Sequence, residues 1–437
     1  MSRQVPSGPF VYADPRQLCI GLHVHLDLQW TAHPFSFSSF KIKTQEQIAT
    51  LQSLGLTRVR ISPARSDTRP LPLPAGPPAA PDAAATAAAD PTAEMLKAAR
   101  AKREQVQRLA AQQARVAACE RELLASARVL KSINQNLYAC PDQVRRESVA
   151  LIDSIADSML VAGDVAIQLM SDKIGNEDSH HHALNVALLS MMLAKELALP
   201  PESIRVLGLG ALFHDIGKLD MPDRVVKKVE PHNKAELALL QLHCERGCEA
   251  VKALKLPAEA LAVLAQHHEM VDASGYPKRL TGAQITPLAK IVAIVTRFDN
   301  LCSPNNPAHA LTPHEALSLM FAKHKAKFDV QILGVFIRMM GVYPPGSAVQ
   351  LTDDRYAMVV SVNSSRPLKP RLIIYNPHIP KAEALVVDLE QQANLGVKRI
   401  IKPMQLPRQA LDYLSPRQHI CYFFERASSL AGGEDVS

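Results

Sequence analysis

The stretch Leu207–Lys218 reads LGLGALFHDIGK, an apolar helical run that ends in an imidazole next to a carboxylate. A carboxylate in an apolar helix is costly unless it is paired or bound to a metal. Neutral imidazole and carboxylate are the usual ligands of iron, manganese or zinc in hydrolytic sites. Because a carboxylate can bridge two cations and a neutral imidazole cannot, we predict that Asp215 bridges a metal pair beside His214.

Other histidines and one lysine extend this hypothesis. A single histidine on a helix is more often a core or surface residue than a ligand, and we expect His180 and His181 at the surface. Lys218 lies four residues after His214 and so shares its helix face, where its charge could hold a phosphate oxygen. The further candidate ligands are His182, His243, His267 and His268.

The motifs themselves resemble a known family. The run LFHDIGK at Leu212–Lys218 resembles the signature of the HD phosphohydrolase superfamily, and HHEMVDASGYP at His267–Pro277 resembles the motif that defines its HD-GYP subfamily. The run HALNV at His182–Val186, and His243 with Gly247, resemble two more helix motifs of that family. The resemblance covers residues 175–320. Residues 12–62, which include Trp30, His33 and Phe40, resemble a domain of unknown function that precedes many HD-GYP domains.

The resemblance implies a metal-dependent cyclic di-GMP phosphodiesterase that forms pGpG, GMP or both. It implies a binuclear divalent centre, for which we expect iron, with manganese or zinc as alternatives. Lys218 and Asp215 would be catalytic, and Lys218 and Tyr276 would contact the substrate. By position, His182, His214 and Asp215 would hold one metal, and Asp215, His243, His267 and His268 would hold the second.

Several positions depart from the family pattern. Thr296 stands where the family has a metal-binding Asp, and a hydroxyl is a much weaker ligand than a carboxylate. Asn305 and Ala308 stand where the family has phosphate-binding cations. Arg297 and His309 lie nearby in the sequence, and we assign Arg297 to the substrate site. Two milder departures are Asp178, a weak candidate ligand where relatives with a third metal have Glu, and Ala273, which replaces a Gly.

These departures leave two functions open. One is an active phosphodiesterase whose activity is reduced by Thr296. The other is a catalytically degenerate HD-GYP domain that binds cyclic di-GMP or acts as a protein-interaction regulator. Hydrolysis of another nucleotide is a third hypothesis, against which the Gly-Tyr-Pro loop argues.

Composition bounds the remaining expectations. The chain has 437 residues, 47% of them apolar, and a net charge of +7 that is spread along the sequence, so we expect no nucleic-acid polymer as a partner. No run is long and apolar enough for a membrane span. The 7 cysteines form no C-x-x-C pair, which indicates free thiols in a reducing cytoplasm. The family resemblance implies a bacterial protein.

We predict a multidomain, mainly α chain. A small α/β module (1–65) includes a helix over 44–54 between strands near Val24 and at 55–62. Strands are also expected at 348–351, 356–362 and 371–375. The further predicted parts are a Pro/Ala-rich linker (66–92), connecting helices (93–140), an all-helical HD-GYP domain (141–342), a mixed α/β C-terminal extension (343–430) and a disordered tail (431–437).

The connecting segment 93–131 carries an apolar residue every seven positions, at Leu109, Val116, Leu123 and Leu130. Such a repeat is typical of a coiled coil, through which the chain would form a homodimer. A helix packed on its own domain is an equally good interpretation. A signalling protein is the other partner we expect.

Overall fold

The computed structural model describes residues 10–28, 33, 35, 38–72, 91–161, 165–169, 178–363, 367–414 and 422–426. Trp30, most of the predicted linker and the predicted tail lie outside these residues. The chain divides into two compact units. The N-terminal unit comprises Met1–Ala111 and Asn376–Ala384, and the main unit comprises Gln112–Tyr375 and Leu385–Ser437.

The N-terminal unit contains the predicted α/β module. Its antiparallel sheet has the strand order β1-β4-β2-β3. The helix α1 (Gln45–Ser53) is capped by Thr44, whose side chain accepts from the backbone of Gln47 in a capping box. Alternation along the strands buries Val24, Val59 and Ile61 with Ile48 and Leu51 of α1. The strands are β1 (Val11–Ala13), β2 (His23–His25), β3 (Ser39–Lys41) and β4 (Val59–Ile61).

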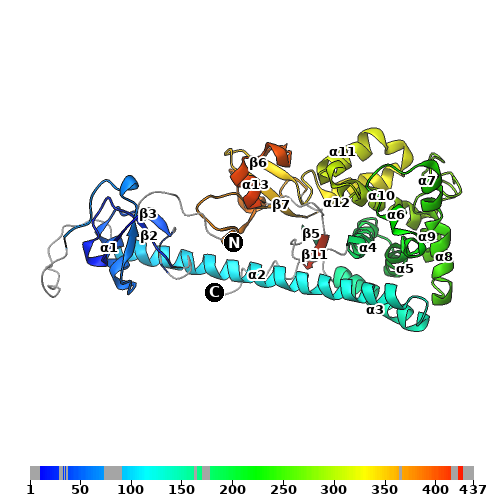
Figure 1. Cartoon of the computed structure of the whole chain (residues 1–437), viewed down its shortest axis with the longest axis horizontal. Coiled ribbons are helices and arrows are strands. Elements are labelled where there is room, and N and C mark those ends of the chain that lie inside the picture. Colours follow the sequence, from blue (N-terminus) through cyan, green and yellow to red (C-terminus); the bar gives the residue numbers. More distant parts are fainter. Residues whose placement is uncertain are drawn as a thin grey trace. The chain divides into compact units, whose positions relative to one another are not determined.

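The connecting segment is a single helix, α2 (Pro91–Asn136), which Figure 1 shows without a break. It is followed by α3 (Pro141–Val161). Two members of the seven-residue repeat, Leu123 and Leu130, are buried in the hydrophobic core of the main unit. That part of the repeat therefore packs on its own domain, which was one of the two interpretations. Homodimerisation through 93–131 stays a prediction.

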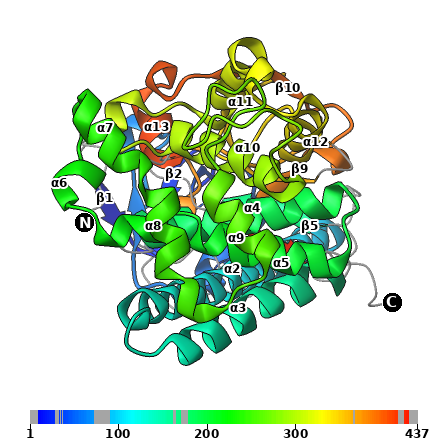
Figure 2. The ribbon, with the colours of Figure 1, turned by 90° about the vertical axis from the view of Figure 1, so that its right-hand side faces the viewer.

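The main unit holds the predicted helical domain, in which α4 packs on α5 and α10, and α5 packs on α9. Figure 2 shows α4, α5, α8, α9 and α10 gathered side by side. The helices are α4 (Asp178–Glu196), α5 (Pro201–Phe213), α6 (Asp223–Val226), α7 (Lys234–Gln241), α8 (His243–Ala250), α9 (Ala258–Gln266), α10 (Pro287–Cys302), α11 (Pro313–Lys323) and α12 (Val330–Met340).

The C-terminal extension forms an antiparallel sheet of order β10-β6-β7-β5-β11, with β8 between β7 and β9. The predicted strands at 348–351, 356–362 and 371–375 are confirmed as β6, β7 and β8. The bounds are β6 (Ala348–Leu351), β7 (Tyr356–Asn363), β8 (Arg371–Ile374), β9 (Val386–Asp388), β10 (Val397–Ile401), α13 (Arg408–Leu414) and β11 (Tyr422–Arg426).

One strand of this sheet differs from the expectation. β5 (Val165–Leu169) lies in the range for which only helices were predicted, and it pairs with β7 and β11. Both partner strands lie near the other end of the chain. The prediction failed because a five-residue segment without a neighbouring strand in sequence has only a weak strand pattern. The predicted fold class, mainly α with a small α/β module and a mixed C-terminal extension, is confirmed.

Two expectations from composition can be compared with the structure. Within the described part of the chain, Cys19, Cys119, Cys140, Cys244, Cys248 and Cys302 are free thiols, as expected. None of the helices among the described residues is long and apolar enough to cross a bilayer.

Candidate metal centre

The centre is built on the break between α5 and the short 3-10 turn η4 (Ile216–Asp220). The apolar helix α5 ends at Phe213, His214 is its C-terminal cap, and Asp215 leaves the helical path. His214 is fully buried, whereas the Asp215 side chain keeps 15% of its surface exposed. Because the helix breaks between them, two neighbours in sequence face the same space, as the sequence predicted.

The other candidate side chains come from separate helices. His182 lies in α4, His243 is the first residue of α8, and His267 caps α9 with His268 directly after it. A close approach of η4 to α8 brings His243 to the others. A Cβ on Gly217 would lie 2.1 Å from the carbonyl oxygen of His243, so only glycine allows this approach.

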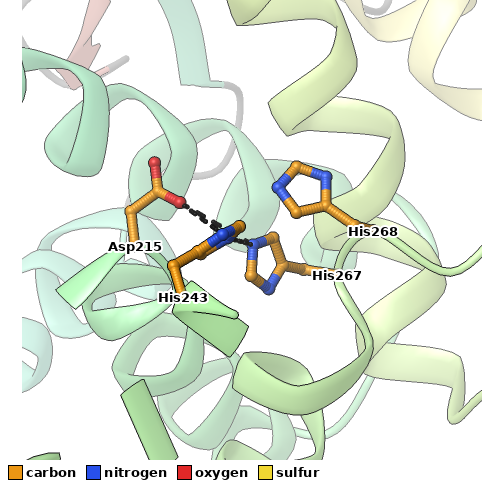
Figure 3. Close-up of side chains that lie close together, drawn as sticks. All are labelled: Asp215, His243, His267 and His268. Carbon is orange, nitrogen blue, oxygen red and sulfur yellow. Dashed lines mark hydrogen bonds and ion pairs between the residues drawn. The ribbon is translucent and has the colours of Figure 1, made fainter. Parts of the chain in front are cut away.

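Asp215 joins two groups of ligand atoms. Its Oδ2 lies 3.4 Å from Nε2 of His182 and 3.5 Å from Nε2 of His214. Its Oδ1 lies 3.3 Å from Nε2 of His243 and 3.8 Å from Nε2 of His267. Figure 3 shows one carboxylate oxygen facing the rings of His243 and His267 while the other points away. This is the arrangement expected of a carboxylate that bridges two cations.

The two groups are unequal. We call the first the small group, which contains His182, His214 and Asp215, and the second the large group, which contains Asp215, His243, His267 and His268. In each group the potential ligand atoms lie within 4.8 Å of one another. The six residues that the sequence named as ligands therefore come together in space.

Helix ends fix three of the imidazole rings. Nδ1 of His214 donates to the carbonyl of Ala211, Nδ1 of His243 to Leu240, and Nδ1 of His267 to Leu264, at 2.7, 2.6 and 2.9 Å. Each carbonyl belongs to the last turn of a helix, where backbone oxygens have no partner farther along that helix. Since a carbonyl only accepts, Nδ1 carries the proton in each ring, and the Nε2 lone pair faces Asp215.

The donor set fits cations. Nε2 of His182 and His214 are 3.2 Å apart, and Nε2 of His243 and His267 are 3.1 Å apart. Burial lowers the pKa of His214 well below its ordinary value and lowers that of His243 to about 4, so both rings stay neutral. Facing lone pairs beside a carboxylate repel one another unless a positive charge lies between them. A cation held by each group would remove that repulsion.

Two charged neighbours adjust this picture. Burial alone would raise the pKa of Asp215, but the nearby Lys218 ammonium and a hydrogen bond from His182 hold it well below its usual range. Nζ of Lys218 donates to Oδ2 of Asp215 at 2.5 Å. Burial would lower the pKa of His182, but hydrogen bonds with Asp215 and Asp299 raise it to about 9. A cation held by the small group would therefore displace a proton from His182.

The Gly-Tyr-Pro loop lies against the large group. The ring of Tyr276 stacks on His268 with centroids 4.6 Å apart. A Cβ on Gly275 would lie 2.4 Å from the backbone nitrogen of Met270, so the loop requires glycine there. The buried carboxylate of Glu269 accepts from the backbone N–H groups of Lys278 and Leu280, at 2.6 and 2.8 Å. These contacts hold Tyr276 beside the histidine pair.

Other predicted positions are placed less directly. Thr296 is 1% exposed and its hydroxyl has no hydrogen-bond partner among the described residues. Arg297 is partly buried on α10, and within the described residues it makes no hydrogen bond or ion pair. The amide of Asn305 donates to the carbonyl of Val226, and Ala308 is exposed in η6 (Pro307–His309) with His309.

Two minor candidates complete the comparison. Asp178 is the first residue of α4, and its side chain and that of His180 lie outside the described residues. His181 is partly buried, not fully at the surface as expected. Sequence reasoning gave no role to Asp299 or Asn185. Asp299 forms a hydrogen bond with His182, and Asn185 donates a hydrogen bond to Asp299. Sequence reasoning also missed Glu269, although a buried acid beside the doublet is a recognisable signal.

Two family models match separate parts of the chain. Residues 164–332 match the family described as HD domain, and residues 13–146 match the domain of unknown function DUF3391. The second match includes all of α2 and the start of α3, beyond the α/β module that the sequence suggested.

Parts of the chain are also similar to curated relatives and to a solved structure. The chain is 31% identical to the cyclic di-GMP phosphodiesterase PA4108 of Pseudomonas aeruginosa, over 52% of this chain and 54% of that protein. It is 29% identical to 3'3'-cGAMP-specific phosphodiesterase 1 of Vibrio cholerae, over 48% and 47%. A solved HDG"Y"P protein from Bdellovibrio bacteriovorus is 16% identical, with a TM-score of 0.38, over 75% of this chain and 98% of that one.

The chain thus spans about half the length of these two curated relatives. The HD domain match covers every candidate ligand from His182 to His268. Residues 164–332 therefore match an HD domain, residues 13–146 match DUF3391, and about half of the chain is similar to curated cyclic dinucleotide phosphodiesterases.

Proposed function

We propose that this protein is a metal-dependent phosphodiesterase that hydrolyses cyclic di-GMP to pGpG or GMP. The observation that carries the proposal is the position of Asp215, whose two oxygens face two separate sets of imidazole nitrogens. The names of the relatives, which act on cyclic di-GMP or on 3'3'-cGAMP, support a cyclic dinucleotide as substrate. Two divalent cations in such a site polarise a phosphoryl oxygen and lower the pKa of bound water.

The chain's own residues would divide the work. The small group would hold one cation and the large group the other, with iron as the proposed metal and manganese or zinc as alternatives. Burial keeps His214 and His243 neutral, so they can donate lone pairs near pH 7. Lys218 donates a hydrogen bond to Asp215, so its positive charge is available to the scissile phosphate.

Two further side chains would recognise the substrate. Tyr276 stacks on His268 at the edge of the large group, which supports its proposed contact with the dinucleotide. Arg297 is a partly buried cation without an ion pair among the described residues, and burial lowers its pKa. An anionic ligand would satisfy that charge, so we assign Arg297 to the substrate phosphates.

A second candidate function rests on the substituted positions. Asn305 binds the backbone carbonyls of Val226 and Lys228 instead of offering a charge, and Ala308 offers none. With Thr296 in place of an acid, the domain would keep its fold and part of its metal site. It would then act as a binding or protein-interaction module for the same dinucleotide.

The test is a combined metal and product analysis. The protein is purified without oxygen, its iron, manganese and zinc are measured, and pGpG and GMP formation from cyclic di-GMP and 3'3'-cGAMP is followed by chromatography. His214→Ala should abolish turnover. The matched control is His232→Ala, because Nε2 of His232 also bonds a backbone carbonyl, that of Val225, but lies outside both groups. Bound metal without turnover would favour the binding module.

The cellular setting follows from the substrate class. A second-messenger hydrolase acts where cyclic dinucleotides are made, so we propose a cytoplasmic bacterial location and a signalling protein as partner. Homodimerisation through residues 93–131 is part of the same proposal. Light scattering at several protein concentrations tests it, and a constant monomer mass would contradict it.

A further inference from the structure

His182 differs from the other imidazoles in how its ring is held. His214, His243 and His267 lie at helix ends, where free carbonyls accept from Nδ1. His182 lies inside α4, where the preceding backbone carbonyls are used by the helix itself. Its Nδ1 therefore needs an acceptor from another element.

That acceptor is Asp299 of α10. Its Oδ2 lies 2.6 Å from Nδ1 of His182, and the residue is buried. The second oxygen, Oδ1, accepts from Nδ2 of Asn185 at 3.0 Å. His182 and Asn185 are three residues apart on α4, so both face α10. Asn185 thereby holds the carboxylate that holds the imidazole.

Asn185 is itself held by the C-terminal sheet. Its Oδ1 accepts from the backbone N–H of Tyr422 at 3.0 Å, and both residues are buried. Tyr422 is the first residue of β11, which packs against α4 and pairs with β5. A continuous chain of hydrogen bonds thus runs from the C-terminal strand through Asn185 and Asp299 to His182.

We propose that Asp299 and Asn185 are positioning residues that couple the strand β11 to His182 and so set the affinity of the small group for its cation. A carboxylate that accepts from Nδ1 fixes the ring proton on that atom and leaves the lone pair of Nε2 available to a cation. The inference rests on the proposed metal centre. It adds that the C-terminal extension completes this centre.

The coupling is one-sided, which makes it testable. In the large group, Nδ1 of His243 and of His267 binds a carbonyl of a helix end, and no hydrogen bond between the described residues ties these rings to β11. Loss of the relay should therefore weaken one cation and spare the other. A general loss of packing would weaken both.

The experiment titrates metal-free full-length protein with Co²⁺ and follows stoichiometry and affinity by calorimetry and by the visible absorption of the bound ion. Asp299→Asn and Asn185→Ala should weaken one of two bound ions by about 10- to 100-fold and leave the other unchanged. Ser190→Ala is the control, because Ser190 is a buried polar residue of α4 whose hydroxyl has no partner among the described residues.

The strand itself is tested by two substitutions at one position. Tyr422→Ala keeps the backbone N–H, whereas Tyr422→Pro removes it at the first residue of an edge strand, where proline is tolerated. The proline variant should bind the weaker ion about 5-fold less tightly than the alanine variant, the effect of one hydrogen bond.

Each outcome separates the inference from the proposed function. The positioning role would be overturned if the Asp299 and Asn185 variants bound both ions equally weakly, or bound them as the wild type does. In that case the wild type would still hydrolyse its substrate, and the proposed function would stand. One-sided weakening in a wild type without turnover would support the positioning role and contradict the phosphodiesterase. A wild type that binds no Co²⁺ would overturn both.

Discussion

Thr296 offers the sharpest perturbation of the candidate centre. It lies on α10 one helical turn before Asp299, so both side chains share a face of that helix. Its 1% exposed hydroxyl has no hydrogen-bond partner among the described residues. Thr296→Asp would place a carboxylate where the family resemblance expects a metal ligand.

The expected size of the effect follows from burial. Without metal, a buried carboxylate beside Asp299 must take up a proton or remain charged. Protonating an Asp of ordinary pKa at about pH 7.5 costs up to about 5 kcal/mol, which bounds the loss of stability. With metal, a further anionic ligand should strengthen binding by about 10- to 100-fold, or about 1.4–2.7 kcal/mol.

The assay compares calorimetric unfolding in chelator and in excess Mn²⁺ for the wild type, Thr296→Asp and Thr296→Asn. The Asn variant has the shape of Asp without its charge, so it should gain no metal dependence. Turnover of cyclic di-GMP should rise in the Asp variant only. If the Asp variant shows the same metal-dependent shift as the Asn variant, or if its activity does not rise, Thr296 is not a missing ligand position.

Three further predictions test separate parts of the molecule. Asp215→Asn should lose at least one metal equivalent and about 1000-fold or more in turnover, since a few kcal/mol of charge stabilisation are lost, measured by metal analysis and product formation. Ala273→Gly should raise the free energy of unfolding by about 1 kcal/mol in denaturant titrations, because Ala273 has φ of 61°, a left-handed conformation that favours glycine. Burial, then the nearby positive charges of His23 and Arg60, lower the pKa of His25 from 6.5 to about 4. The N-terminal unit should therefore lose stability as pH falls from about 6.5 toward 4, and His25→Gln should flatten that dependence in thermal melts.

The sequence could name the candidate ligands because their motifs are local. The pair His214 and Asp215 at a helix end, and the doublet before the Gly-Tyr-Pro loop, can each be found in a short window. The structure brings these side chains together with His182 and His243, as expected. That these side chains bind metal stays a prediction, which metal analysis can test. The predicted helix over 44–54 was equally local, because Thr44 and Gln47 form its cap.

The supporting contacts could not be predicted, because they join residues far apart in the chain. His182 and Asp299 are 117 residues apart, and Asn185 and Tyr422 are 237 apart. No periodicity within a helix reports which polar residue of another helix it meets. The strand β5 was missed for the same reason, since its pairing partners lie in the C-terminal extension.

Metal occupancy of the small group decides between the two proposed functions. The large group has three imidazoles and the shared carboxylate, whereas the small group has two imidazoles and the same carboxylate. The Lys218 ammonium also donates a hydrogen bond to Oδ2 of Asp215, which makes that oxygen a weaker ligand for a cation in the small group. We therefore expect the large group to bind its cation more tightly, and the small group to depend on the orientation of His182. If the small group fills at cellular metal concentrations, the enzyme is complete. If it stays empty, the domain keeps a single cation and the binding function is the better proposal.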